Sequence, residues 1–191
     1  MRDSVRSGPR PGFTLLEIMI VLVMIGILGG LAIPRLNTGR FKVDAAMHVA
    51  QAALQQAERS AIQRQTNVIA SFDIANNRIR IHNDVNNNGT IDAGETTRWM
   101  TLEDGVRFAT PPKGLTSGSV ASPVTGNNIK TSADGFPMIT YRRDGAASSS
   151  AEIYMRSSST DTNDFRVLTV TQSTGRVDLY RYGIGVWRKA R

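Results

Sequence analysis

The sequence predicts an α+β fold in which a long, kinked N-terminal helix packs on an antiparallel β-sheet. The N-terminal third holds an apolar run followed by a stripe of small and apolar residues at helical spacing. The rest of the chain alternates apolar and polar residues in short segments. Turn-rich joins between these segments favour antiparallel strands, and the helix stripe can cover one face of the sheet.

The apolar run extends from Phe13 to Ile33, and its 21 residues are apolar or glycine except Thr14 and Glu17. A helix rises about 1.5 Å per residue, so a helix of this length covers the hydrocarbon core of a bilayer. The sequence therefore predicts one transmembrane helix. Glu17 either lies shallow, at the lipid headgroups, or meets a partner that offsets the cost of a carboxylate in the membrane.

A short basic leader, residues 1–12, precedes the apolar run and holds three arginines and one aspartate. An ordinary secretory signal is cleaved after its apolar region, beyond small residues, and this pattern differs from it. Arginines before the run place the N-terminus in the cytoplasm and the C-terminal bulk outside it.

The start of the apolar run resembles the prepilin cleavage and methylation motif of type IV pilins and type II secretion pseudopilins. The matching residues are Gly12, Phe13, Thr14, Leu15, Leu16 and Glu17, followed by the apolar tail. The resemblance implies cleavage between Gly12 and Phe13 by a prepilin peptidase and N-methylation of the new Phe13 amine. It also implies that Glu17 meets such an amine on a neighbouring subunit, in a single-pass protein of the bacterial inner membrane with a periplasmic C-terminal domain.

The helix is expected to continue beyond Pro34 to about Gln65. Proline removes a backbone donor and disfavours helix in the preceding residue, so a kink or short break is expected between Ile33 and Thr38. The stripe that would face a core contains Val43, Ala46, Ala50, Leu54, Ala57 and Ala61.

The period changes to two from Asn67 onward. Residues 68–72 and 78–82 form a predicted hairpin, with Asn76 and Asn77 as its turn. Further strands are expected at 98–102, 106–108, 136–141, 152–155, 165–170 and 175–182. Residues 111–135 are rich in Ser, Thr, Gly, Asn and Pro, which predicts a long surface loop.

Residues 57–64, followed directly by a strand, resemble the GspH/FimT branch of minor pseudopilins and minor pilins. This resemblance implies a pilin-like fold with four parts: a leader (1–12), a transmembrane helix (13–33), an amphipathic second half of the helix (34–65) and a β-rich periplasmic domain (66–191). It implies a structural subunit of a type II secretion pseudopilus, taking part in protein secretion with other pseudopilins or pilins and with secreted cargo. The alternative is a FimT-like minor type IV pilin that binds DNA during uptake.

Residues 84–95 fit the spacing of a calcium-binding loop, with oxygen side chains at the first, third, fifth, ninth and twelfth places and glycine at the sixth. The candidate ligands are Asp84, Asn86, Asn88, Thr90, Asp92 and Glu95. Asn-rich runs with glycine also form ordinary turns, and this loop is expected to join strands. Weak calcium binding and a plain turn therefore both remain open.

The C-terminal segment from Gly175 to Arg191 has five positive side chains and one negative, with aromatic residues between them. The candidate DNA-binding residues are Arg176, Arg181, Arg188, Lys189 and Arg191. Some FimT-like pilins bind DNA through a Gly-Arg-x-Arg motif, which this chain matches at Gly175 and Arg176 but not at Asp178. A closing strand with a solvated basic face is the alternative.

Enzyme classes are not indicated. The chain has two histidines and no cysteine, so it offers no thiolate metal site and no disulfide. It also has no nucleophile-elbow, phosphate-loop or zinc-ligand spacing. We therefore expect a role in assembly and not in catalysis.

Overall fold

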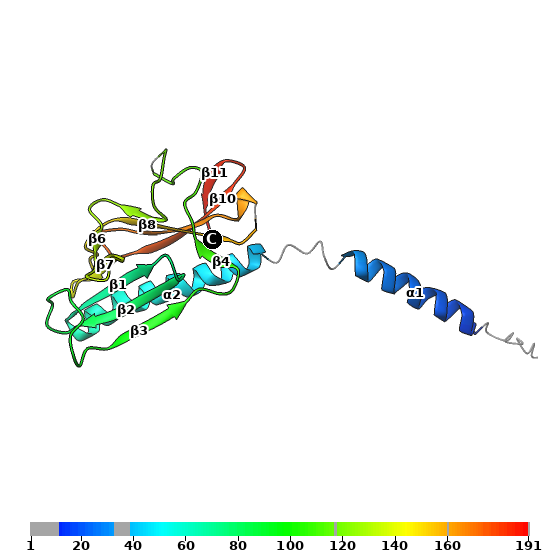
Figure 1. The fold of residues 1–191 in the computed structure, drawn as a ribbon, viewed down its shortest axis with the longest axis horizontal. Helices are drawn as coiled ribbons and strands as arrows, with labels where there is room; N and C mark the ends of the chain where they lie inside the picture. The colour runs from blue at the N-terminus through cyan, green and yellow to red at the C-terminus, as the bar shows by residue number, and fades with distance from the viewer. Residues whose placement is uncertain (1–11, 33–38, 117, 160, 191) are drawn as a thin grey trace, which may run out of the picture. The chain divides into compact units, whose positions relative to one another are not determined.

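The computed structural model describes residues 12–32, 39–116, 118–159 and 161–190 (Figure 1). The chain divides into two compact units, residues 1–37 and residues 38–191. The predicted leader, up to residue 11, and the predicted kink between Ile33 and Thr38 lie outside the described residues.

The first unit contains helix α1, Leu15–Ala32. Thr14 caps it: the Thr14 hydroxyl accepts a hydrogen bond from the Glu17 amide at 3.1 Å, and the Thr14 carbonyl accepts one from the Ile18 amide at 3.2 Å. No helix among the described residues is both long and apolar enough to cross a membrane. The transmembrane helix of residues 13–33 therefore stays a prediction.

The second unit begins with helix α2, Gly39–Arg64, which is kept in place by its apolar stripe. All six residues of the predicted stripe are buried, and Met47 joins them. Most of the stripe is alanine, so the strands can approach the helix axis closely.

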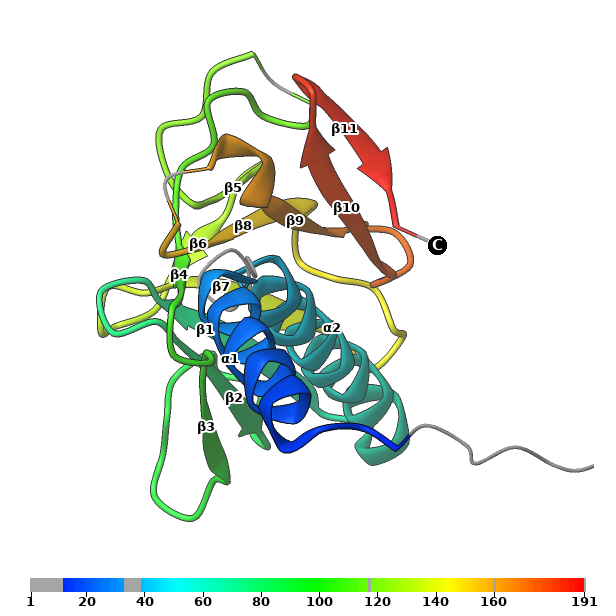
Figure 2. The same ribbon diagram turned by 90° about the vertical axis from the view of Figure 1, so that its right-hand side faces the viewer.

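Two antiparallel sheets pack against α2 (Figure 2). The first sheet has the order β3 (Thr97–Thr101), β2 (Arg78–Asp84), β1 (Asn67–Asp73), β7 (Pro137–Tyr141) and β6 (Lys130–Thr131). The second has the order β11 (Val186–Lys189), β10 (Val177–Gly183), β9 (Arg166–Val170), β8 (Ala151–Ser157) and β4 (Val106–Phe108), and β5 (Val124–Gly126) pairs with β8. The α+β prediction of a helix on antiparallel strands is confirmed.

The core lies between α2 and the facing sides of the two sheets. Phe72 of β1 meets Phe108 of β4 edge to face, with ring centroids 6.2 Å apart, and so links the sheets directly. The alternation that predicted the strands cannot tell which strands share a sheet, so it gave no sign of two sheets.

The predicted loop of residues 111–135 is partly wrong, because it contains β5 and β6. These strands have three and two residues, too few to show a period of two. Val124 is nevertheless buried and pairs with Ile153 of β8.

Candidate functional site

The predicted processing site lies before α1. Gly12 and Phe13 are exposed and outside the helix, and 80% of the Phe13 surface is accessible. Glu17 is in the first turn of α1, where a carboxylate is favoured by the positive end of the helix dipole. The large apolar side chains from Leu15 to Leu28 are exposed around the whole helix. Within its described residues, α1 therefore presents an exposed apolar surface with one acid in its first turn.

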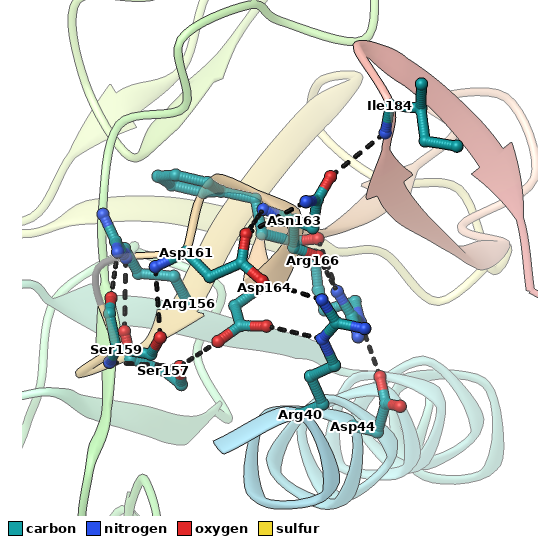
Figure 3. Close-up of polar contacts among 11 residues, drawn as sticks. Arg40, Asp44, Arg156, Ser157, Ser159, Asp161, Asn163, Asp164, Arg166 and Ile184 are labelled. Atoms are coloured by element: carbon teal, nitrogen blue, oxygen red, sulfur yellow. Dashed lines mark hydrogen bonds and ion pairs between the residues drawn. The ribbon is translucent and has the colours of Figure 1, made fainter. Parts of the chain in front are cut away.

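A second site anchors the beginning of α2 to the β-domain (Figure 3). Arg40 donates from Nε to Asp164 Oδ1 at 3.1 Å and from NH2 to Asp161 Oδ2 at 2.7 Å. Asp164 is fully buried in the short helix η2, Thr162–Asp164, and also accepts from the Ser157 hydroxyl at 2.7 Å. Hydrogen bonding from the Asn163 amide, and then from Arg40, lowers the pKa of Asp161.

One turn further along α2, Asp44 binds the second sheet. Its Oδ1 accepts from Arg166 Nε at 2.5 Å (Figure 3). Its Oδ2 lies 3.4 Å from Arg181 NH2. Arg166 is buried and also donates to the carbonyls of Asn163 and Phe165. The bonds from Arg40 to the η2 aspartates and from Arg166 to Asp44 join residues more than 120 positions apart. No local signal in the sequence could therefore have predicted them.

The predicted calcium loop is closed by its own side chains. Asp84 is buried and accepts from the amides of Asn88 and Gly89, both at 2.9 Å. Asp92 Oδ2 accepts from the side-chain amides of Asn86 at 2.7 Å and Asn88 at 2.6 Å. Thr90 donates from its amide and its hydroxyl to Asn88 Oδ1. The structure thus brings these five candidate residues together in one hydrogen-bonded turn.

Glu95 fixes the end of this loop to the sheet. It accepts from the amides of Asp92 at 3.0 Å and Val85 at 2.8 Å, and it lies 2.7 Å from Nε2 of the buried His82. The hydrogen bond from the Asp92 amide, the larger cause, and the hydrogen bond with His82 lower the pKa of Glu95 to about 2. Within the described part of the chain, no three His, Cys, Asp or Glu side chains are arranged to hold a metal ion. Calcium binding stays a prediction.

The C-terminal basic residues lie on the β10–β11 hairpin. Arg176 and Lys189 both pair with Asp178, at 3.1 and 3.0 Å, and Arg181 pairs with Asp44. Arg188 lies opposite Arg181 in the strand register, whereas Arg191 lies outside the described residues. Three of the four described candidates thus pair with an acid of the chain itself, although Arg176 and Lys189 share Asp178 and Arg181 shares Asp44 with Arg166.

Two family models match the chain. The prokaryotic N-terminal methylation motif matches residues 10–33, and the type II transport protein GspH model matches residues 46–175, about two thirds of the chain. The chain belongs to the GspH family. The GspH region begins within α2 and ends before β10, so the candidate DNA-binding residues lie beyond it.

Solved structures are similar to this chain at low identity. The minor pseudopilin EpsH of Vibrio cholerae gives a TM-score of 0.51 at 11% identity, covering 73% of this chain and 96% of that one. A second EpsH structure gives 0.49 at 12% identity, covering 72% and 95%. The type IV minor pilin FimU of Pseudomonas aeruginosa gives 0.44 at 18% identity, covering 74% and 90%. A search of curated proteins found no match.

Proposed function

We propose that this GspH-family chain is a structural subunit of a type II secretion pseudopilus, anchored in the bacterial inner membrane before assembly. The observation that carries the proposal is the apolar surface of α1, exposed on every side and headed by one acid, directly after the processing motif. Exposed apolar surface of this extent needs lipid or other helices to cover it. Lipid would cover the apolar surface of α1 before assembly. The helices of neighbouring pseudopilins would cover it afterwards.

Processing by a prepilin peptidase would create the partner that Glu17 needs. Cleavage after Gly12 leaves a new amine on Phe13, and that amine carries a positive charge at neutral pH. Within one chain the two groups are separated by the Thr14 cap and the first turn of α1. A Glu17 carboxylate that meets the Phe13 amine of a neighbouring chain would remove both charges from the apolar contact and fix the axial register of the two helices.

Helix α2 and the β-domain would then travel as one body, because Arg40 and Asp44 bind the start of α2 to η2, β9 and β10. A pulling force on α2 would reach the β-domain through these partly buried charge pairs and the apolar stripe. Secreted cargo and DNA stay predicted partners of the exposed loops and of the hairpin.

Replacing Glu17 tests the proposal. We expect Glu17→Ala to leave the amount of chain in the membrane fraction unchanged and to lower the amount in sheared pseudopili at least tenfold, because the amine of the neighbour loses its charge partner (about 1.5–3 kcal/mol). Leu16→Ala removes apolar surface in the same turn without removing charge, and serves as the control. Normal incorporation of the Glu17→Ala chain would contradict the proposal.

A further inference from the structure

Strand β3 is an open edge of the first sheet (Figure 1). It pairs with β2 on one side, and no described strand pairs with it on the other. The other strands at the ends of the two sheets, β6, β4 and β11, have two, three and four residues, whereas β3 has five. It contains no proline, and its one charged residue is Arg98. Edge strands are templates for pairing with another chain unless prolines, charges or bulges block them.

The register with β2 shows which backbone groups of β3 face the open edge. The Asn83 amide donates to the Thr96 carbonyl at 3.0 Å, and the Leu102 amide donates to the Asn77 carbonyl at 2.9 Å. Backbone groups alternate in direction along an antiparallel strand, so every second residue from Thr96 to Leu102 faces β2. The N–H and C=O groups of the residues between them face outward, and in β3 these residues are Thr97, Trp99 and Thr101.

A groove of about 470 Å³ runs beside this edge, with α2 on one side and β2 and β3 on the other. Arg98 and Met100 of β3 pair with Ile81 and Ile79 of β2, and Ile79 belongs to the core, so this face of β3 turns toward α2. Val49 of α2 lines the groove and is 56% exposed. The first sheet therefore ends before it covers this side of the helix, and one further strand beside β3 would cover it.

The groove is positively charged where β3 begins. Asn83 bonds to Thr96, before β3, and pairs with Val68, shortly after α2, so the start of β3 lies near the C-terminal end of the helix. Arg64 and Arg98 both line the groove, and both are exposed. Neither forms an ion pair within the described part of the chain. A carboxylate placed here would meet two guanidinium groups, which form strong hydrogen bonds with carboxylates.

The other end of the groove carries the opposite charge. Val49 and Met100 also line a smaller pocket of about 170 Å³, which continues the groove and includes Glu103. Every strand pair in the first sheet is antiparallel, and a strand antiparallel to β3 would reach Arg98 with its C-terminal end. We propose that an extended segment of another polypeptide adds to β3 in this direction, with apolar side chains in the groove and a carboxylate near its C-terminal end beside Arg98 and Arg64.

A short peptide serves as the probe. It has the sequence Thr-Val-Thr-Val-Thr-Glu-Thr, with fluorescein at its N-terminus and an amide at its C-terminus, so the valines and the glutamate share one face. Its binding to the full chain in detergent is measured by fluorescence anisotropy. We expect saturable binding that weakens at least about tenfold when lysine replaces the glutamate, because the lysine would face two arginines.

Methylation of the peptide amides tests strand pairing directly. With the glutamate opposite Arg98, the last three threonines lie opposite the outward-facing residues of β3 and exchange hydrogen bonds with them. A peptide N-methylated at its threonines should therefore bind at least about tenfold more weakly. A peptide N-methylated at its valines and glutamate should bind like the unmodified one. Binding that never saturates, or an equal loss with both methylated peptides, overturns the proposal.

A charge exchange tests the basic end of the groove. Arg98→Glu should weaken binding of the glutamate peptide at least about tenfold and should restore binding of the lysine peptide. Arg107→Glu is the matched control, because Arg107 is an exposed arginine of β4, the edge strand of the second sheet, and its replacement changes the net charge equally. Equal weakening by the two substitutions would show attraction to net charge alone and would also overturn the proposal.

Discussion

Arg176 donates from Nε to Asp178 Oδ1 at 3.2 Å, and Lys189 Nζ lies 3.0 Å from the same oxygen. Asp178 stands where the second arginine of a Gly-Arg-x-Arg motif would stand. An aspartate at this position means that the motif has one arginine fewer. The same aspartate also neutralises part of the charge of Arg176 and Lys189. This arrangement favours a closing hairpin with paired charges over a surface that binds phosphates.

DNA binding by the wild-type chain should consequently be weak, and Asp178→Arg should strengthen it. The substitution supplies the missing arginine and leaves Arg176 and Lys189 without their acid, so we expect an affinity for duplex DNA that falls steeply with salt. Fluorescence anisotropy across a salt series measures it. Micromolar binding by the wild-type chain that disappears when Arg176, Arg181 and Arg188 become alanine would support the DNA-uptake alternative instead.

Asp44 should contribute to stability mainly through Arg166 and little through Arg181. Asp44→Ala leaves the buried Arg166 guanidinium without its acid, and we expect a loss of about 2–3 kcal/mol in the free energy of unfolding. Arg181→Ala removes a half-exposed partner of the same carboxylate and should cost less than about 1 kcal/mol. Denaturant unfolding compares the two variants, and equal losses would show that the buried pair does not anchor α2.

Gly175 should tolerate no side chain. Its φ is +66°, and a Cβ there would lie 2.2 Å from the carbonyl oxygen of Gly145. We expect Gly175→Ala to destabilise the domain by about 3 kcal/mol or more, because backbone must move. Gly185→Ala, with φ +76° but open space around it, is the control and should cost about 1 kcal/mol. Similar melting temperatures for the two variants would contradict the close approach.

Acid should release the loop of residues 84–95 through Glu95. Its pKa is lowered in the folded state, so its contribution to stability is complete above pH 4.5, the ordinary value, and is lost as the pH falls toward 2. We expect the Tm of the wild type to fall more steeply than that of Glu95→Gln over this range. Parallel curves would mean that the carboxylate is not needed to fix the loop.

Calcium provides a separate test of the same loop. The side-chain nitrogens of Asn86 and Asn88 now donate to Asp92 Oδ2. Calcium binding would require both amides to turn their oxygens toward the ion instead. A rise in Tm with several millimolar calcium that Asp92→Ala abolishes would confirm the predicted site. An unchanged Tm would leave the loop as a hydrogen-bonded turn.

Local patterns predicted much of this protein, and long-range contacts account for what they missed. The stripe from Val43 to Ala61 and the hairpin around Asn76 follow from spacing within a few residues, and the structure confirms both. The Arg40 and Asp44 pairs depend on residues over 120 positions away. Ser71, Arg80 and His82 are buried on the face of the first sheet away from the core, where periodicity predicts only an exposed polar side.

The mass of the chain recovered from purified pseudopili tests the assembly role of this protein. Assembly through Glu17 requires a chain that begins at an N-methylated Phe13, because cleavage after Gly12 exposes the amine that Glu17 of a neighbour would meet. Mass spectrometry of the N-terminal peptide should therefore find Phe13 with one added methyl group. A chain that still carries residues 1–12, or that is absent from the pseudopili, would contradict the assembly role.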